Sequence, residues 1–191
     1  MQNIRIGYAV TGSFCTFAES FKAAERLVGE GCALTPIFSF NAYNLSTRFG
    51  SAEENRERLE KICRCKGIST IEDAEPVGPR KMFDLLIVAP CTSNTLAKLA
   101  CGVNDTPVTM AVKSHLRNAG PVLIAVSTND ALAAAAKNIG ILQNSRNYFF
   151  VPYRQDDIFK KPMSMVADFS LISPAAEAAL RGEQIQPMVR G

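Results

Sequence analysis

The chain has 191 residues, a length typical of one domain. Hydrophobic residues make up 47% of it and charged residues 20%, as in an ordinary soluble globular protein. The net charge is only +3, and acidic and basic residues are mixed along the chain, so neither nucleic acid nor a membrane is an expected partner.

The cysteines and the single histidine do not form a metal-binding pattern. Cys63 and Cys65 form a C-x-C pair, and His115 lies far from them in the sequence. A structural zinc site needs about four converging ligands, so no metal is expected. The N-terminal residues do not resemble a signal peptide, and no apolar run reaches about 18 residues, which predicts a cytoplasmic protein.

Apolar runs alternate with helical patterns through the N-terminal half. The runs are continuous, as in strands buried on both faces, and the helical patterns carry apolar residues on one side. The predicted order is strand 4–10, helix 17–28, strand 32–38, helix 53–63, strand 67–71 and loop 75–81.

The C-terminal half continues this alternation up to a charged stretch. The predicted order is strand 85–89, helix 93–101, helix 105–116, strand 121–126, helix 129–142, strand 148–151, irregular segment 152–162 and helix 167–180. Strands alternating with helices indicate parallel βαβ units. We therefore predict a three-layer, doubly wound, Rossmann-like α/β fold with a six-stranded parallel sheet. Residues 1–182 form one domain, and residues 183–191 form a tail that is free to dock on a partner.

Polar side chains follow most of the predicted strands. Ligands of open α/β sheets bind at the carboxyl ends of the strands, where free N–H groups of helix N-termini favour anions. The candidates are Gly12, Ser13, Ser39, Thr92, Ser93, Asn94, Thr95 and Ser127. Any one hydroxyl alone is better explained as a helix cap, but their convergence favours a nucleotide-like ligand.

Cys91 lies within this polar group and has two interpretations. As a nucleophile it requires a base, and the only histidine, His115, is expected at the opposite edge of the sheet. A cysteine packed beside a ligand is the favoured interpretation. Arg48, Arg154 and Lys161 lie in or beside loops on the same rim and suit an acidic substrate, although solvated loop charge explains each of them alone.

The segment "APCTSNTLAKLACGVND" and the "TGS" after the first strand resemble the flavoprotein superfamily of homo-oligomeric flavin-containing decarboxylases. The matching residues are Pro90, Thr92, Asn94, Thr95, Lys98, Gly102 and Asp105. The resemblance implies FMN as cofactor and assembly into trimers or multiples of them. It implies that Gly12, Ser13 and Ser39 contact the flavin phosphate and ribityl chain. Residues 92–95 and Ser127 then lie along the ribityl chain and ring.

Further segments, including "STRFG" and "NYFFVPYRQDD", resemble one oxidoreductase branch of that superfamily. The resemblance implies oxidation of a dihydrodipicolinate-type intermediate of the lysine pathway in the mother cell of a sporulating bacterium. It also implies a partner A subunit that binds NAD(P).

The decarboxylating relatives carry a P-x-M-N-x-x-M segment, where this chain has "AVSTNDAL", and some carry an early catalytic histidine that is missing here. A flavin-dependent decarboxylase or prenyl-transfer enzyme, and a non-catalytic scaffolding subunit, remain the alternatives.

Overall fold

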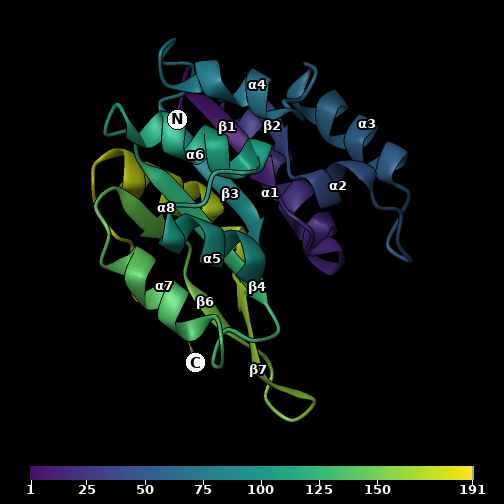
Figure 1. Ribbon diagram of the computed structural model, residues 1–191, viewed down its shortest axis with the longest axis vertical. Helices are drawn as coiled ribbons and strands as arrows, with labels where there is room; N and C mark the ends of the chain where they lie inside the picture. Colours follow the sequence, from purple (N-terminus) through teal and green to yellow (C-terminus); the bar gives the residue numbers. More distant parts are fainter. Residues whose placement is uncertain (191) are drawn as a thin grey trace.

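The computed structural model describes residues 1–190, which surround one twisted sheet with helices on both faces (Figure 1). The sheet has seven strands in the order β2-β1-β3-β4-β7-β6, with β5 also paired to β4. The strands are β1 (Arg5–Val10), β2 (Ala33–Phe38), β3 (Leu85–Cys91), β4 (Val122–Thr128), β5 (Tyr148–Phe150), β6 (Tyr153–Asp157) and β7 (Lys161–Ala167). The predicted doubly wound α/β class is confirmed. The predicted six parallel strands are instead five, β1 to β5, with β6 and β7 antiparallel.

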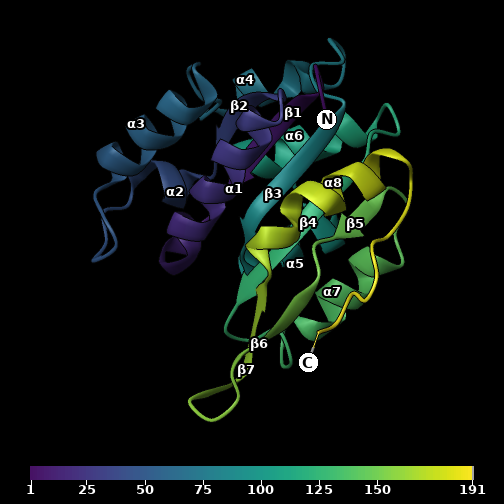
Figure 2. The same ribbon diagram turned by 180° about the vertical axis from the view of Figure 1, so that it is seen from behind.

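Two groups of helices cover the sheet. They are α1 (Phe17–Gly29), α2 (Phe40–Asn44), α3 (Ala52–Cys63), α4 (Ile71–Ala74), α5 (Ser93–Cys101), α6 (Pro107–Leu116), α7 (Ala136–Gln143) and α8 (Ile172–Leu180), with short 3₁₀ turns η1 (Phe14–Thr16), η2 (Glu75–Val77) and η3 (Phe169–Leu171). Helices α5, α6 and α7 lie in front of the sheet in Figure 1, and α1 and α8 lie in front in Figure 2. No helix within residues 1–190 is long and apolar enough to span a membrane.

The core is centred on β3 and β4, which are almost wholly buried. Polar groups inside it are paired. Tyr8 is fully buried, and its hydroxyl donates to the carbonyl oxygen of Ser20 at 2.8 Å. The Ser20 hydroxyl in turn donates to the carbonyl oxygen of Ala89 at 2.6 Å. These bonds fix the start of α1 against the end of β3, where the polar residues of the site begin.

The strand predicted over residues 67–71 is wrong. Only Ile68 pairs with β2, through a single bridge to Ile37. The side chain of Thr70 then accepts a hydrogen bond from the Asp73 amide and caps α4. The capping signal therefore ends the extended segment after one bridge.

The irregular segment predicted over 152–162 is also wrong, because β6 and β7 form a hairpin there that projects from the body of the molecule (Figure 1). Its residues are largely exposed and charged, so no apolar pattern marks them as strands. The Asp157 carboxylate closes the turn by accepting hydrogen bonds from the amides of Phe159 and Lys160 at 3.1 and 2.9 Å.

Two helices begin later than predicted. Asp130 does not cap a helix, because its carboxylate accepts the hydroxyl of Thr128, and α7 begins only after a series of turns. The closing helix α8 begins after β7 and η3. Asp168 caps η3 by accepting from the Ser170 amide at 3.0 Å.

Candidate cofactor and substrate pocket

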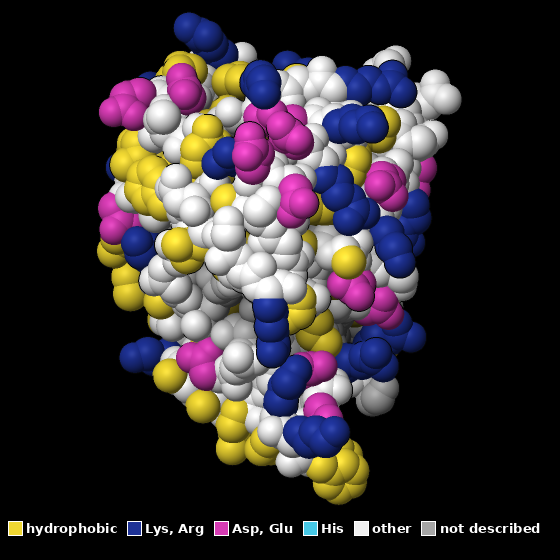
Figure 3. Space-filling view, turned by 90° about the vertical axis from the view of Figure 1, so that its right-hand side faces the viewer, with side chains coloured by type: hydrophobic (Ala, Val, Ile, Leu, Met, Phe, Trp, Pro, Cys, Tyr) yellow, Lys and Arg dark blue, Asp and Glu magenta, His cyan; other side chains and the backbone are white. Residues whose placement is uncertain are grey.

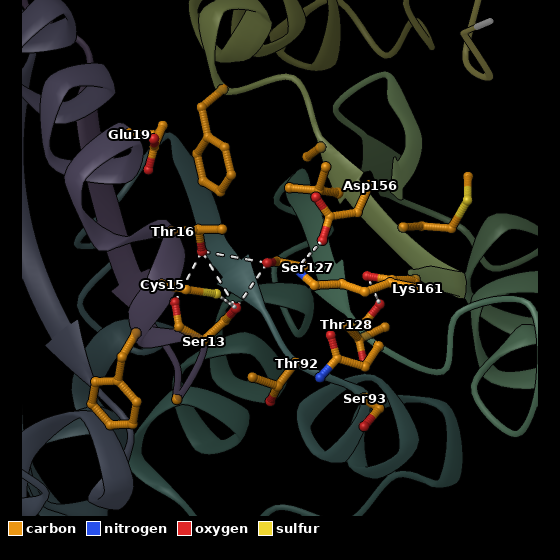
Figure 4. Close-up of a pocket in the computed structure, with 18 of the residues that line it drawn as sticks. Ser13, Cys15, Thr16, Glu19, Thr92, Ser93, Ser127, Thr128, Asp156 and Lys161 are labelled. Atoms are coloured by element: carbon orange, nitrogen blue, oxygen red, sulfur yellow. Dashed lines mark hydrogen bonds and ion pairs between the residues drawn. The ribbon is translucent and has the colours of Figure 1, made fainter. Parts of the chain in front are cut away.

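A cavity of about 1040 Å³ lies at the carboxyl ends of β1, β3 and β4. The starts of α1 and α5 form one side, and the β6–β7 hairpin forms the other (Figure 4). Of the predicted site residues, it is lined by Gly12, Ser13, Thr92, Ser93, Ser127, Arg48, Arg154 and Lys161. The structure thus brings together most of the side chains that the sequence placed on one rim.

Three hydroxyls from two strand ends meet in this cavity. The hydroxyls of Ser13 and Ser127 are 2.8 Å apart, and that of Thr16 lies 3.3 Å from Ser127. Thr16 also donates to the carbonyl oxygen of Ser13 at 2.9 Å. The cluster joins the loop after β1 to the end of β4 and presents hydroxyl groups to the cavity (Figure 4).

A buried threonine joins β1 to β3 beneath this cluster. Thr11 is 1% exposed, and its hydroxyl donates to the carbonyl oxygen of Pro90 at 2.8 Å. The hydroxyl oxygen of Thr11 also accepts the amide of Thr92 at 3.0 Å. Both backbone groups thereby have hydrogen-bond partners at the carboxyl ends of the strands, so the floor of the pocket has a fixed shape.

The helices that start at the pocket lack side-chain caps. No side chain caps α5, and none caps η1 or α1. Of the other helices, α2, α3, α4 and α6 are capped by Ser39, Ser51, Thr70 and Thr106, whereas α7 and α8 also lack side-chain caps. The first-turn N–H groups of α5 are therefore left to a ligand or water, and the helix dipole makes this end favourable for an anion.

Three predicted contacts lie outside the cavity lining. Ser39 is buried and caps α2 by accepting the Ala42 amide at 3.2 Å. Asn94 is exposed in the first turn of α5. Thr95 is buried, with its hydroxyl 3.3 Å from that of Thr92. In this structure, Ser39 and Thr95 support the pocket walls from behind.

The cationic side chains differ in how they are held. Lys161 pairs with Asp156 at 2.6 Å, and the Arg48 guanidinium lies 4.8 Å from the ring centre of Phe49. Arg154 forms no ion pair with any residue between 1 and 190. A cavity lined by several cations suits a ligand with more than one negative group.

The sequence did not indicate several further lining residues. Cys15 lies in η1 and Glu19 in the first turn of α1, and Arg190 and Asp168 meet at 2.6 Å on the hairpin side. Glu19 follows Cys15 by four residues, and this helical spacing could have predicted that both side chains face the pocket. Nothing in the sequence indicated Arg190, because its position depends on how the C-terminal tail folds back.

The structure separates Cys91 from any histidine base. Cys91 is fully buried, and burial raises the pKa of its thiol, so the thiolate is disfavoured. His115 lies at the other end of the sheet, where its Nε2 is 3.1 Å from the carbonyl oxygen of Pro121. Cys91 is therefore a packing residue under the pocket, and its interpretation as a nucleophile is not supported.

Comparison with known proteins agrees with this fold. Residues 1–175 match the family Flavoprotein. The chain belongs to this family. It is 42% identical over 185 residues to the B subunit of dipicolinate synthase from Bacillus subtilis, covering 97% of this chain and 92% of the relative.

Two solved structures extend this comparison. The crystal structure of the dipicolinate synthase B subunit from Bacillus halodurans superposes with a TM-score of 0.91 at 36% identity, covering 100% of this chain and 97% of the other. The FMN-dependent cysteine decarboxylase SpaF superposes with a TM-score of 0.66 at 20% identity, covering 94% and 97%, and shows a shared fold.

Proposed function

We propose that the chain acts as the B subunit of dipicolinate synthase. Together with the A subunit, it oxidises a dihydrodipicolinate-type intermediate of the lysine pathway to dipicolinic acid. The observation that carries this proposal is the pocket itself, where hydroxyls and an uncapped helix N-terminus face a cationic hairpin across one cavity. This combination suits a phosphate-bearing cofactor beside a dicarboxylate. The similarity to the Bacillus subtilis relative over almost the whole chain supports it.

The residues of the pocket fit FMN. The phosphate suits the uncapped start of α5 and the loop after β1, and the ribityl hydroxyls suit Ser13, Thr92 and Ser127. A Cβ at Gly12 would meet nothing closer than 3.5 Å, so this glycine is not required by its protein neighbours, and it leaves room for a ligand. A bound flavin supplies a two-electron acceptor.

The proposed reaction requires only positioning and charge complementarity from this chain. The dihydropyridine substrate loses a hydride equivalent to the acceptor and a proton to solvent, and becomes aromatic. The acceptor would be FMN, held in this pocket by Ser13, Thr92 and Ser127, or NAD(P) carried by the A subunit. Arg48, Arg154 and Lys161 bind the two carboxylates and orient the ring.

We further propose that the chain forms a homo-oligomer, a trimer or a multiple of one, in the mother-cell cytoplasm of a sporulating bacterium. Exposed apolar side chains beside the pocket support self-association, because Phe40, Leu45 and Phe49 are 42%, 46% and 47% exposed. The mass of the assembly in solution tests this.

Reconstitution tests the proposed function. The chain and the A subunit are purified separately, and formation of pyridine-2,6-dicarboxylate is measured with each alone and with both, with and without FMN. We expect product at an appreciable rate only when both are present. A rate for the A subunit that this chain leaves unchanged would contradict the proposal, and a visible flavin spectrum of the purified chain would identify the cofactor independently.

A further inference from the structure

The C-terminal tail packs on its own domain as far as Arg190, whereas the sequence leaves it free to dock on a partner. The side chain of Gln184 accepts the amide of Phe150 at 2.7 Å and donates to its carbonyl oxygen at 2.8 Å. Further along, the amide of Tyr153 donates to the carbonyl oxygen of Met188 at 3.0 Å, and the amide of Arg190 donates to the carbonyl oxygen of Tyr153 at 3.0 Å. The tail thus adds a short parallel bridge to the outer edge of β6.

This pairing decides which side chains face the pocket. Val189 pairs with Tyr153, so Arg190 lies beside Arg154 on the opposite face. Arg154 pairs with Val166 of β7, and Asp168 follows two residues later on the same side. Three adjacent segments therefore present Arg154, Asp168 and Arg190 on one face. All three residues line the cavity.

Asp168 holds Arg190 without using all of its donors. The two side chains meet through one nitrogen, with Nη1 of Arg190 2.6 Å from Oδ2 of Asp168. The other oxygen of Asp168 accepts the amide and the hydroxyl of Ser170. A guanidinium has five N–H donors in a planar fork, so Arg190 keeps donors for a second carboxylate.

The charges on this face leave a net positive site. Partial burial raises the pKa of Asp168, but the hydrogen bonds from Ser170 and the charges of Arg190 and Arg154 outweigh it and hold that pKa below its usual value. The carboxylate is therefore ionised, and two guanidinium groups face it. One positive charge is left over, and no other ion pair within residues 1–190 neutralises it.

We infer that Arg154 and Arg190 form a carboxylate-binding subsite of the pocket, in which Asp168 orients Arg190. This inference rests on the proposed function, and it assigns to the tail a role in recognising a cyclic dicarboxylate. Arg48, which also lines the cavity, takes the second carboxylate. A monocarboxylate can use either site, whereas only a dicarboxylate uses both.

The test compares two ligands on the full-length chain. Binding of pyridine-2,6-dicarboxylate and of pyridine-2-carboxylate is measured by calorimetry for the wild type, Arg190→Gln and Arg190→Lys. Arg181→Gln serves as the matched control, because Arg181 lies in the same part of the chain, is paired with Glu183 and does not line the cavity. We expect Arg190→Gln to lower the affinity for the dicarboxylate by about 10- to 100-fold and that for the monocarboxylate by about twofold at most.

Arg190→Lys should recover part of the loss, since it restores the charge without the planar fork, and Arg181→Gln should change nothing. Melting temperatures of all variants establish that each is folded. Tight dicarboxylate binding that Arg190→Gln leaves unchanged would overturn the subsite and leave the proposed function standing. A wild-type chain that binds neither ligand would overturn the proposed substrate class and the subsite with it.

Discussion

The two sides of the pocket are held together by different interactions. On the strand-end side, Thr11 is buried and bonded to backbone groups of Pro90 and Thr92 at the end of β3. On the hairpin side, Lys161 and Asp156 form an ion pair whose side chains are 53% and 35% exposed. Exposed ion pairs contribute about 0–1 kcal/mol, whereas a buried polar group left unpaired costs about 1–3 kcal/mol. The first side is a preformed cradle suited to a resident cofactor. The second is a charged, projecting wall suited to a substrate that enters and leaves (Figure 3).

The largest expected effect comes from the floor of the cradle. Thr11→Val keeps the shape of the side chain but leaves the carbonyl of Pro90 and the amide of Thr92 without their partner. We expect the free energy of unfolding to fall by about 2–4 kcal/mol, as measured by urea denaturation. Arg154→Gln, on the hairpin side, should change it by less than about 0.5 kcal/mol. Equal effects of the two substitutions would remove the distinction between the sides.

A negative charge at the start of α5 should raise the stability of the helix and lower the affinity for the cofactor. Ser93→Asp places a carboxylate in the first helical turn, which stabilises the helix by about 0.3–1 kcal/mol. The same charge repels a phosphate, so we expect FMN affinity to fall about 100-fold, measured by fluorescence titration. Ser93→Asn is the uncharged control. Unchanged FMN affinity in the aspartate variant would place the phosphate elsewhere.

A substitution in the β6–β7 hairpin should weaken substrate binding and leave FMN binding unchanged. Arg154→Gln removes a guanidinium that lines the cavity, and we expect affinity for pyridine-2,6-dicarboxylate to fall about tenfold while FMN affinity stays within about twofold. The two titrations are made on the same preparation. If both affinities fell together, one ligand would span both sides of the cavity.

The smallest effect is expected at the far end of the sheet. Burial lowers the pKa of His115, so the folded chain binds its proton less readily than the unfolded chain does. Stability from this residue is complete above the unfolded pKa of about 6.5 and is lost as the pH falls below it. His115→Gln should therefore reduce the decline in melting temperature between pH 7 and pH 5, without changing FMN affinity. An identical decline in both proteins would show that another group causes it.

The sequence predicted the cradle better than the hairpin, and the reason is physical. Strand ends followed by hydroxyl residues are local signals, and the order of parallel strands brings them to one edge. The hairpin is stabilised by backbone pairing of exposed, charged residues, which carry no apolar alternation. The opposite error occurs at residues 67–71, where a strand was predicted and does not form. The cap at Thr70 starts a helix there and outweighs the apolar residues of the segment. Arg190 could not be predicted at all, since only the folded tail brings it to Asp168.

The most direct test is a crystal structure of the wild-type chain with FMN and pyridine-2,6-dicarboxylate. We predict the phosphate at the start of α5, the ribityl chain along Ser13, Thr92 and Ser127, and one carboxylate on Arg154 and Arg190. FMN bound outside this cavity, or the dicarboxylate occupying the cradle in its place, would contradict the division of the pocket into a cofactor side and a substrate side.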